Sequence, residues 1–221
     1  MDIARPAILV DICGTLFDSN TTFDFLDYSI VKRSYKFYRH LRKTFFWRLL
    51  NKSLHTLGYD LSRTIAIRFL KGKSRKELDV LMDTFYAKKL SMLKHHAVWE
   101  KVDALRSNGD ELILVSATLD FIAAKIAAIN GFNTVFATTL SFDNEVCNGV
   151  ICSDLLGKKG AFLEKENIYA PYKMVITDNL SDLNLIEASN DAIIVCTPRN
   201  QKIWNSALQK IDYRNYEFIL V

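Results

Sequence analysis

The segment ILVDICGTLFDSN, residues 8 to 20, leads from an apolar run into a turn of small residues that carries acidic side chains. The run from Pro6 to Asp11 is rich in β-forming residues, and Gly14 follows it. This pattern predicts a buried strand that enters a tight turn, with Asp11 at its carboxyl end. Cys13 lies in this turn between acidic residues, and the strand pattern alone gives no reason for a thiol there.

After about Ser107, apolar runs alternate with segments of helical periodicity. Further strands are predicted at residues 111–117, 134–138, 173–178 and 192–196. Helices are predicted at residues 119–130, 159–167 and 181–189. The region through Asn148-Gly149 is rich in turn formers, so a turn-rich connection is expected there. The alternation is typical of a parallel sheet with helices on both faces, and we expect a doubly wound α/β fold.

Between the first two predicted strands, the apolar residues follow helical periodicity and no strand is predicted. Ser74 and Glu77 have the spacing of a capping box at the start of one of these helices. Because the helical segment interrupts the sheet after its first strand, we interpret it as an insertion. The predicted domains are a core of residues 1–18 and 101–221 and an inserted all-helical cap of residues 19–100.

The composition is that of an ordinary globular protein. The chain has 221 residues, of which 49% are hydrophobic and 24% charged, and this length allows a sizeable core. No uninterrupted apolar stretch approaches the length of about 18 residues that a membrane span requires, so we expect a cytoplasmic protein without a targeting segment. The four cysteines form no C-x-x-C pair, and neither a disulfide framework nor a zinc site is expected.

Polar residues at the ends of the predicted strands form a set. Asp11 ends the first strand and Ser116 the second, while Asp178 ends the fourth and precedes Asp182 by one helical turn. Ligands of open parallel sheets bind beyond the carboxyl ends of the strands, so these side chains are expected to meet. Two adjacent carboxylates repel each other unless a hard cation lies between them, and an incomplete oxygen shell suits Mg²⁺. These strand-end residues therefore predict a site that acts on a phosphate group with the help of a metal ion.

Anion-binding groups accompany these acids. The Gly14-Thr15 turn offers backbone N–H groups, Ser116 adds a hydroxyl group, and Lys159 could neutralise a phosphate oxygen. Each residue alone also has a purely structural explanation: an Asp after a strand is commonly a turn or N-cap residue, and Lys159 or its neighbour Lys158 could be a solvated surface lysine. Their occurrence together and in this order favours the phosphate site.

Four motifs resemble those of the haloacid dehalogenase (HAD) superfamily of phosphohydrolases, whose pattern is D-x-D-G-T, a Ser or Thr, a Lys, and D-x-x-x-D. In this chain they read DICGT at 11–15, ILVSAT at 113–118, GKKGAFL at 157–163 and ITDNLSD at 176–182. The helical insertion is similar to the cap of the phosphoserine-phosphatase-like branch. The resemblance implies a HAD-like core with a helical cap, and a phosphatase or phosphotransferase acting on a small phosphorylated metabolite or a lipid head group.

The resemblance also assigns catalytic roles. It makes Asp11 the nucleophile that attacks phosphorus and becomes an aspartyl phosphate. Thr15 and Ser116 would hold phosphate oxygens, and Lys159 would offset the negative charge of the nucleophile and the phosphoryl group. Lys159 is preferred to Lys158 because its position matches the register of the family's helix.

The cofactor implied by the resemblance is Mg²⁺. Its predicted ligands are the carboxylates of Asp11 and Asp178 and the backbone carbonyl of Cys13. Asp182 is the fourth residue assigned to the metal site, where it would orient the ligands.

Cys13 replaces the second Asp of the family's first motif, which protonates the leaving alkoxide and then deprotonates the attacking water. A thiol with an ordinary pKa of about 8.5 is a poor substitute. Losing a positioned acid and base typically slows each step by about 10²–10⁴-fold. Three hypotheses follow: phosphoryl transfer from a substrate with a good leaving group, slow phosphatase activity with a water or another residue in the role, or binding of Mg²⁺ and a phosphorylated ligand without turnover.

One segment of the chain is strongly basic. Residues 29–58 contain eight Lys and Arg side chains and no acid, although the net charge of the whole chain is only +4. Six aromatic residues are interleaved with the cations of residues 32–52. The hypotheses are peripheral contact with an anionic membrane, attraction of an anionic substrate or partner, and a cap helix with a solvated basic face and an aromatic core face. No nucleic-acid partner is expected.

Overall fold

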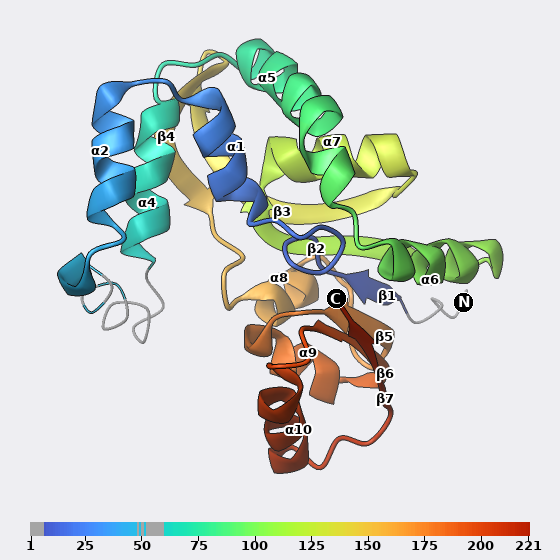
Figure 1. Cartoon of the computed structure of the whole chain (residues 1–221). Coiled ribbons are helices and arrows are strands. Elements are labelled where there is room, and N and C mark those ends of the chain that lie inside the picture. Colours follow the sequence, from blue (N-terminus) through green and yellow to red (C-terminus); the bar gives the residue numbers. More distant parts are fainter. Residues whose placement is uncertain (1–6, 48, 50, 52–59) are drawn as a thin grey trace.

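The protein folds around one seven-stranded sheet with helices on both faces (Figure 1). The computed structural model describes residues 7–47, 49, 51 and 60–221. The strand order is β4-β3-β2-β1-β5-β6-β7, and every neighbouring pair is parallel except β3 and β4. The strands are β1 (Ile8–Val10), β2 (Leu112–Leu119), β3 (Thr134–Asp143), β4 (Val146–Ser153), β5 (Tyr172–Thr177), β6 (Ser189–Cys196) and β7 (Tyr216–Leu220). The predicted doubly wound α/β fold is confirmed.

Helices fill most of the remaining chain. They are α1 (Thr21–Ser29), α2 (Arg33–Leu41), α4 (Leu61–Ile67), α5 (Arg75–Lys88), α6 (His96–Ser107), α7 (Asp120–Asn130), α8 (Lys159–Lys165), α9 (Leu183–Glu187) and α10 (Gln201–Lys210). Short 3₁₀ turns are η1 (Arg68–Leu70), η2 (Leu90–Leu93) and η3 (Leu180–Asp182). The predicted capping box is present at the start of α5, where Ser74 and Glu77 cap each other. In the described part of the chain, no helix has the length and apolar character that a bilayer crossing needs.

The central strand β1 is covered on both faces. Ile8 and Val10 belong to the core beneath α6 and α7, whereas Leu9 belongs to the core beneath α8, α9 and α10. A strand buried on both faces needs apolar residues at every position, which explains the continuous ILV run. The apolar segment that opens the sequence is therefore the middle of the sheet.

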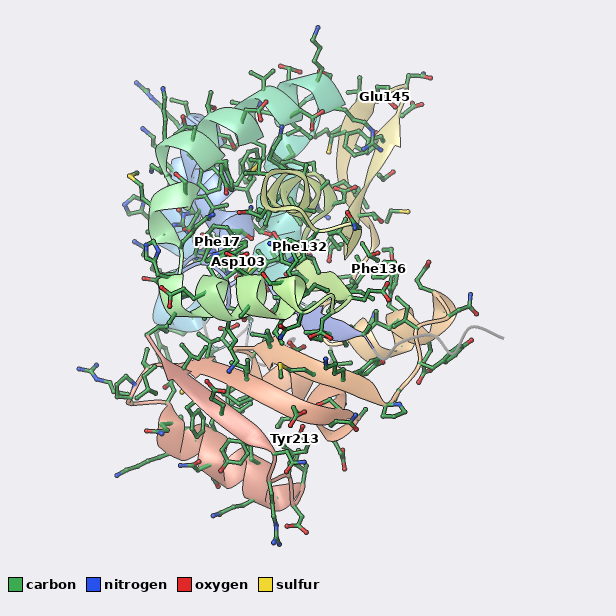
Figure 2. The ribbon with its side chains drawn as sticks, turned by 90° about the vertical axis from the view of Figure 1, so that its right-hand side faces the viewer. Phe17, Asp103, Phe132, Phe136, Glu145 and Tyr213 are labelled. Carbon is green, nitrogen blue, oxygen red and sulfur yellow. The ribbon has the colours of Figure 1, made fainter. Side chains whose placement is uncertain are left out.

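Helix α6 holds the loop that follows β1. The indole Nε1 of Trp99 donates a hydrogen bond to the backbone oxygen of Leu16 at 2.9 Å. The ring of Trp99 packs edge-on against those of Phe17 and Phe132, with centroids 5.7 and 6.2 Å away, and both phenylalanines lie beside α6 in Figure 2. Such pairs contribute about 0.5–1.5 kcal/mol each beyond the burial of their area. These contacts keep the loop after Asp11 in place.

The helical insertion is attached to the edge of the sheet. Backbone hydrogen bonds run from Cys147 N to Lys73 O at 2.8 Å and from Gly72 N to Cys147 O at 2.9 Å. Helix α5 also packs on α7, which covers the sheet. The helical character of the insertion agrees with the sequence pattern, while the exact division into core and cap stays a prediction.

The prediction of a turn-rich connection through Asn148-Gly149 is corrected by the structure. This segment is an antiparallel hairpin of β3 and β4, whose tight turn places Asn144 and Glu145 at φ values of 46° and 65°. The prediction was wrong because Asn148 and Gly149, which resemble a turn, lie inside β4. Gly149 is required there, since an added Cβ would lie 3.0 Å from Arg68 Cα.

Two further elements differ from the prediction. Strand β7, an edge strand with partly buried or exposed residues, was not predicted, although YEFIL at 216–220 consists mostly of β-forming residues. The helix predicted at residues 181–189 is split into η3 and the short α9, and Ser189 already begins β6. Neither error changes the order of the central strands.

The strand order reverses between β1 and β5. The chain builds one half of the sheet outward from β1 through β2 and β3, and the other half from β5 through β6 and β7. The backbone N–H of Asp11 donates to Ile176 O at 2.9 Å, so the residues after β1 and β5 leave the sheet side by side. Ligands of doubly wound sheets bind at this position.

Candidate active site

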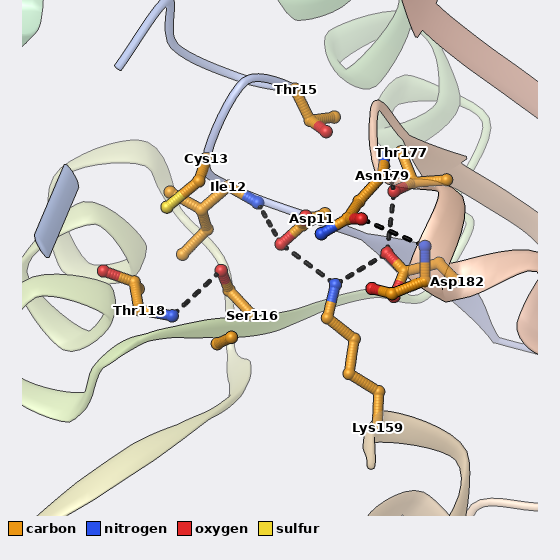
Figure 3. A network of polar contacts seen from close by, with 12 residues as sticks. Asp11, Ile12, Cys13, Thr15, Ser116, Thr118, Lys159, Thr177, Asn179 and Asp182 are labelled. Carbon is orange, nitrogen blue, oxygen red and sulfur yellow. Dashed lines mark hydrogen bonds and ion pairs between the residues drawn. The ribbon is translucent and has the colours of Figure 1, made fainter. Parts of the chain in front are cut away.

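Asp11 lies at the carboxyl end of β1 and is only 5% exposed. Its Oδ1 accepts a hydrogen bond from the backbone of Ile12 at 2.8 Å and lies 3.1 Å from Lys159 Nζ (Figure 3). Within the described residues, its Oδ2 makes no hydrogen bond or ion pair. One oxygen is therefore held in place while the other is available for chemistry.

Lys159 is the first residue of α8 and joins two acids. Its Nζ lies 2.8 Å from Asp182 Oδ2, which also accepts a hydrogen bond from Thr177 Oγ1 at 2.7 Å. Burial alone would lower the pKa of Lys159, but the charges of Asp11 and Asp182 outweigh it and raise that pKa. The side chain is therefore a fixed cation, whereas its neighbour Lys158 is exposed.

Asp178 follows β5 and is held by Thr15. The Thr15 hydroxyl donates to Asp178 Oδ1 at 2.9 Å and accepts from the Asp178 backbone N–H at 2.9 Å. Burial, and then the negative charge of Asp11, raises the pKa of Asp178 to about 7. Two carboxylates thus share a confined space in which their charges repel.

This pair of carboxylates fits Mg²⁺. Among the described residues, no group of three His, Cys, Asp or Glu side chains is arranged to hold a metal. Asp182 is engaged by Lys159 and Thr177, so the side chains left to bind a cation are Asp11 and Asp178. Mg²⁺ commonly binds through one or two carboxylates and keeps several waters. A cation between Asp11 and Asp178 would also remove the repulsion that raises the pKa of Asp178.

A cavity of about 120 Å³ lies over Asp11. Its walls come from both parts of the chain, with Asp11, Ser116 and Lys159 on the sheet side and Asn20, Phe23 and Arg63 on the side of the insertion. Ser116 is buried, and its Oγ accepts a hydrogen bond from Thr118 N at 3.3 Å. Its own O–H can still donate to a bound oxygen atom. The cavity therefore presents a carboxylate, a hydroxyl group and a cation to one small space.

Cys13 also lines this cavity. Its Sγ lies 2.9 Å from Thr21 Oγ1, which lies 2.6 Å from Thr118 Oγ1. Burial, and then the negative charge of Asp11, raises the pKa of the thiol. The predicted contact of the Cys13 carbonyl with Mg²⁺ stays a prediction.

Of the predicted site residues, Asp11, Cys13, Ser116 and Lys159 line this cavity, whereas Thr15, Asp178 and Asp182 do not. The hydroxyl of Thr15 is used by Asp178 as both donor and acceptor, and the residue is fully buried. Thr15 therefore orients Asp178, and its predicted contact with a phosphate oxygen stays a prediction. Asp178 borders a second cavity, of about 230 Å³, together with Gly14 and His95.

Arg63 is a cavity residue that the sequence did not reveal. It lies on α4 and is 5% exposed, its Nη1 donates to Asp154 Oδ1 at 2.6 Å, and its Nη2 donates to the backbone oxygen of Ala117. Ala117 follows Ser116, so Arg63 connects the insertion to the strand end that lines the cavity. Arg63 and Asp154 lie 91 residues apart, and in the sequence each resembles an ordinary charged surface residue.

The family model for haloacid dehalogenase-like hydrolases matches residues 8–187. The chain belongs to this family. The matched range includes Asp11, Ser116, Lys159 and Asp182, and thus every element of the site at the strand ends. The match confirms the predicted superfamily and the predicted enzyme class, a HAD-type hydrolase.

Several solved structures share the fold of this HAD-family hydrolase. A protein of unknown function from Bordetella pertussis Tohama I is 19% identical with a TM-score of 0.68, covering 96% of this chain and 98% of that chain. A substrate-bound phosphoserine phosphatase is 18% identical with a TM-score of 0.60, covering 88% and 87%. Cytosolic 5'-nucleotidase IIIB bound to cytidine is 12% identical with a TM-score of 0.61, covering 98% and 80%. These likenesses establish the fold, and no curated protein matches the sequence.

Proposed function

We propose that this HAD-family hydrolase cleaves or transfers the phosphoryl group of a small phosphorylated metabolite or lipid head group, through an aspartyl phosphate on Asp11. The placement of Asp11 carries this proposal. One of its oxygens is held by Lys159 and the Ile12 backbone, and the residue lines a cavity that Ser116 shares. A carboxylate with one anchored and one available oxygen is suited to nucleophilic attack.

The proposed reaction has two steps. First, Asp11 Oδ2 forms a bond to phosphorus while the bond from phosphorus to the leaving oxygen breaks. Lys159 offsets the negative charge in this step, and the Ser116 hydroxyl donates to a phosphoryl oxygen. Second, a water oxygen bonds to phosphorus, the bond to Asp11 breaks, and phosphate is released. If an acceptor other than water enters, the second step is a transfer.

The proposed cofactor is Mg²⁺, held by Asp11 and Asp178. When bound, it would supply positive charge for the phosphoryl oxygens. The support for this assignment is the confined pair of carboxylates and the raised pKa of Asp178. The two hydrogen bonds between Thr15 and Asp178 would hold that carboxylate in one orientation.

Cys13 makes hydrolysis the slow half of the reaction. A neutral thiol is a poor base for water, and the side chains that Cys13 contacts directly or through one hydroxyl, Thr21 and Thr118, carry only hydroxyl groups. A substrate with a good leaving group, such as an acyl phosphate, needs little protonation in the first step. For such a substrate, we expect Asp11 to be phosphorylated faster than it is hydrolysed.

Trapping of the phosphorylated enzyme tests this proposal. The protein is incubated with Mg²⁺ and a labelled acyl phosphate, and in parallel with chromogenic phosphoesters. We expect label on the wild type and none on Asp11→Asn. Rapid turnover of simple phosphoesters would contradict a slow second step. No label and no turnover with any donor would overturn the catalytic proposal and favour a non-catalytic homologue that binds a phosphorylated ligand.

Substitution of Cys13 tests the origin of the slow step. Cys13→Asp is expected to release phosphate from the labelled enzyme about 10²-fold faster or more, because it restores a positioned base. Cys13→Ala is the control, and its rate should stay close to that of the wild type. If Cys13→Asp does not raise the rate, the missing carboxylate does not limit hydrolysis.

A further inference from the structure

The aromatic residues of the basic segment divide into two sets, of which one faces inward. The rings of Tyr35 and Tyr38 lie 5.1 and 5.9 Å from the ring of Phe69. The indole Nε1 of Trp47 donates to Ser62 Oγ at 2.8 Å. These contacts attach the segment to α4 and η1, and Figure 1 shows α2 beside α4 at the outer edge of the molecule.

The other aromatic set faces outward. Phe37, Phe45 and Phe46 are 71%, 73% and 82% exposed, and the rings of Phe45 and Phe46 contact each other with centroids 6.0 Å apart. The hypothesis of an aromatic face packed only on the core is therefore wrong for these three residues. Clustered exposed apolar side chains with a surrounding polar rim are typical of interaction sites.

Exposed cations lie close in the sequence to the exposed rings. Lys32, Arg33, Lys36 and Lys43 are exposed, and Arg33 and Phe37 share one face of α2 because they are four residues apart. We define the basic aromatic surface as these four cations with the three outward rings: Lys32, Arg33, Lys36, Phe37, Lys43, Phe45 and Phe46. No acid occurs in residues 29–58. Asp27, the acid that precedes this range, is already paired with Arg39.

Helix α2 also contacts the wall of the active-site cavity. The guanidinium group of Arg42, just after α2, lies 3.8 Å from the ring centroid of Phe23, and Phe23 lines the cavity over Asp11. The guanidinium group of Arg39 lies 6.0 Å from the same ring. The element that carries the basic aromatic surface is therefore in direct contact with the cavity wall.

We propose that the basic aromatic surface docks this hydrolase on an anionic lipid membrane. A Lys or Arg near an anionic leaflet contributes about 1 kcal/mol, and aromatic side chains enter the boundary between head groups and acyl chains. The surface supplies both kinds of contact within residues 32–46. The proposal goes beyond the reaction assigned to Asp11, because docking requires no turnover.

The composition of the surface favours a bilayer over other anionic partners. Single-stranded nucleic acid is bound by aromatic rings that stack on bases along a positively charged groove. Here the rings are exposed, and the same stretch of chain carries the aliphatic residues Val31 and Leu41, which are 77% and 38% exposed. Exposed aliphatic and aromatic residues flanked by flexible cations, with no acid among them, match an anionic membrane interface.

Flotation with lipid vesicles tests the electrostatic contribution. The full chain is mixed with phosphatidylcholine vesicles with and without phosphatidylglycerol. We expect flotation only with the anionic vesicles. The variant Arg33→Glu, Lys36→Glu, Lys43→Glu should lose about 100-fold or more in partitioning. The matched control, Arg199→Glu, Lys202→Glu, Lys210→Glu, changes the net charge equally at exposed sites near α10 and should bind like the wild type.

A second variant tests the apolar contribution. Phe37→Ser, Phe45→Ser, Phe46→Ser should abolish flotation at physiological salt. Its control replaces exposed apolar residues elsewhere, Met92→Ser, Val150→Ser, Ile203→Ser, and should float like the wild type. Thermal unfolding establishes that each variant is folded.

Two results would overturn the docking proposal: no flotation of the wild type with anionic vesicles, or equal flotation of each variant and its control. If the wild type does not float but binds a single-stranded oligonucleotide, the partner is a nucleic acid instead. Labelling of Asp11 by a soluble acyl phosphate is measured on the same samples. Flotation without labelling would contradict only the proposed reaction. Labelling without flotation would contradict only the docking proposal.

Discussion

Gly14 and Asp178 come from distant parts of the sequence and meet so closely that an added Cβ on Gly14 would lie 2.1 Å from Asp178 Oδ2. Gly14 also has a φ of +71°, a conformation that disfavours residues with a Cβ. Both the conformation and the close approach therefore require glycine. The turn after β1 and the carboxylate after β5 form one packed unit beside Asp11.

Gly14→Ala is predicted to destabilise the protein by about 3 kcal/mol or more, because it adds a clash with Asp178 to the usual cost of about 1–2 kcal/mol for a left-handed residue. Gly109→Ala is the control, since Gly109 has a φ of +79° and nothing within 4 Å of the added Cβ. Urea unfolding measures both. In an Asp178→Ala background, the extra loss should disappear, and an equal loss in both backgrounds would contradict the contact.

Lys159→Met is predicted to lower the free energy of unfolding at pH 7 by about 3–5 kcal/mol, because it leaves buried carboxylates unpaired. Lys158→Met changes an exposed neighbour and should stay within about 0.5 kcal/mol of the wild type. Urea unfolding in the presence of a chelator compares the two variants. Equal stability of Lys159→Met and the wild type would show that the ion pair with Asp11 does not form.

The stability of Lys159→Met is also predicted to depend on pH. Burial raises the pKa of Asp182, while Lys159 opposes this shift. Without Lys159, the folded protein holds a proton on Asp182 up to a higher pH than the unfolded chain does. Its stability should therefore rise as the pH falls from 7 toward 5, which narrows the difference from the wild type. A difference that is constant with pH would contradict this account.

Arg63→Met is predicted to cost about 2 kcal/mol at pH 7, because Arg63 donates to a charged partner, Asp154. Burial acts to raise the pKa of Asp154, but Arg63 and the hydrogen bonds outweigh it and hold that pKa below its usual range. Because the pKa of Asp154 is lower in the folded protein, its carboxylate stabilises the fold at pH values above its unfolded pKa of about 3.9. This stabilisation is lost as the pH falls below that value and through the folded pKa.

The effect of Arg63→Met should therefore shrink at acid pH, which urea unfolding across a pH series measures. Arg63→Lys keeps the positive charge but cannot reach both Asp154 and the Ala117 carbonyl as the planar guanidinium does, so an intermediate loss is expected. Unchanged stability of Arg63→Met at pH 7 would contradict the contact.

Mg²⁺ is predicted to raise the free energy of unfolding, by about 2.7 kcal/mol when its concentration is 100 times the dissociation constant. Asp178→Asn should abolish this increase, because it removes one of two carboxylates at the site. Asp191→Asn, which changes an exposed acid at β6, is the control and should keep it. Calorimetry with and without Mg²⁺ measures the shift. A shift that persists in Asp178→Asn would place the metal elsewhere.

Much of the site could be predicted because its residues follow apolar runs. Asp11, Ser116 and Asp178 each come at or near the end of a buried strand, and parallel strands bring such ends to one edge. The contact of Thr15 with Asp178 and that of Arg63 with Asp154 could not be predicted. Both join residues far apart in the chain, and nothing local in the sequence distinguishes a buried threonine or arginine from an exposed one.

The strand pattern failed where local composition and tertiary packing disagree. Asn148 and Gly149 have the composition of a turn, yet they lie in β4, because the Gly149 backbone packs against Arg68. Strand β7 was missed although its run YEFIL consists mostly of β-forming residues, and only the tertiary structure shows that it pairs with β6 at the edge of the sheet.

The alternation of apolar runs and helical segments was sufficient to establish the doubly wound sheet and to place Asp11 and Asp178 at its active edge, since periodicity reports which side of an element is buried. The tertiary structure decided three things that periodicity cannot report. It set which oxygen of Asp11 is anchored by Lys159, it placed the Cys13 thiol against the Thr21 hydroxyl, and it separated the outward ring of Phe37 from the buried ring of Tyr38. Each depends on which distant side chains pack around a group, and therefore on the whole fold.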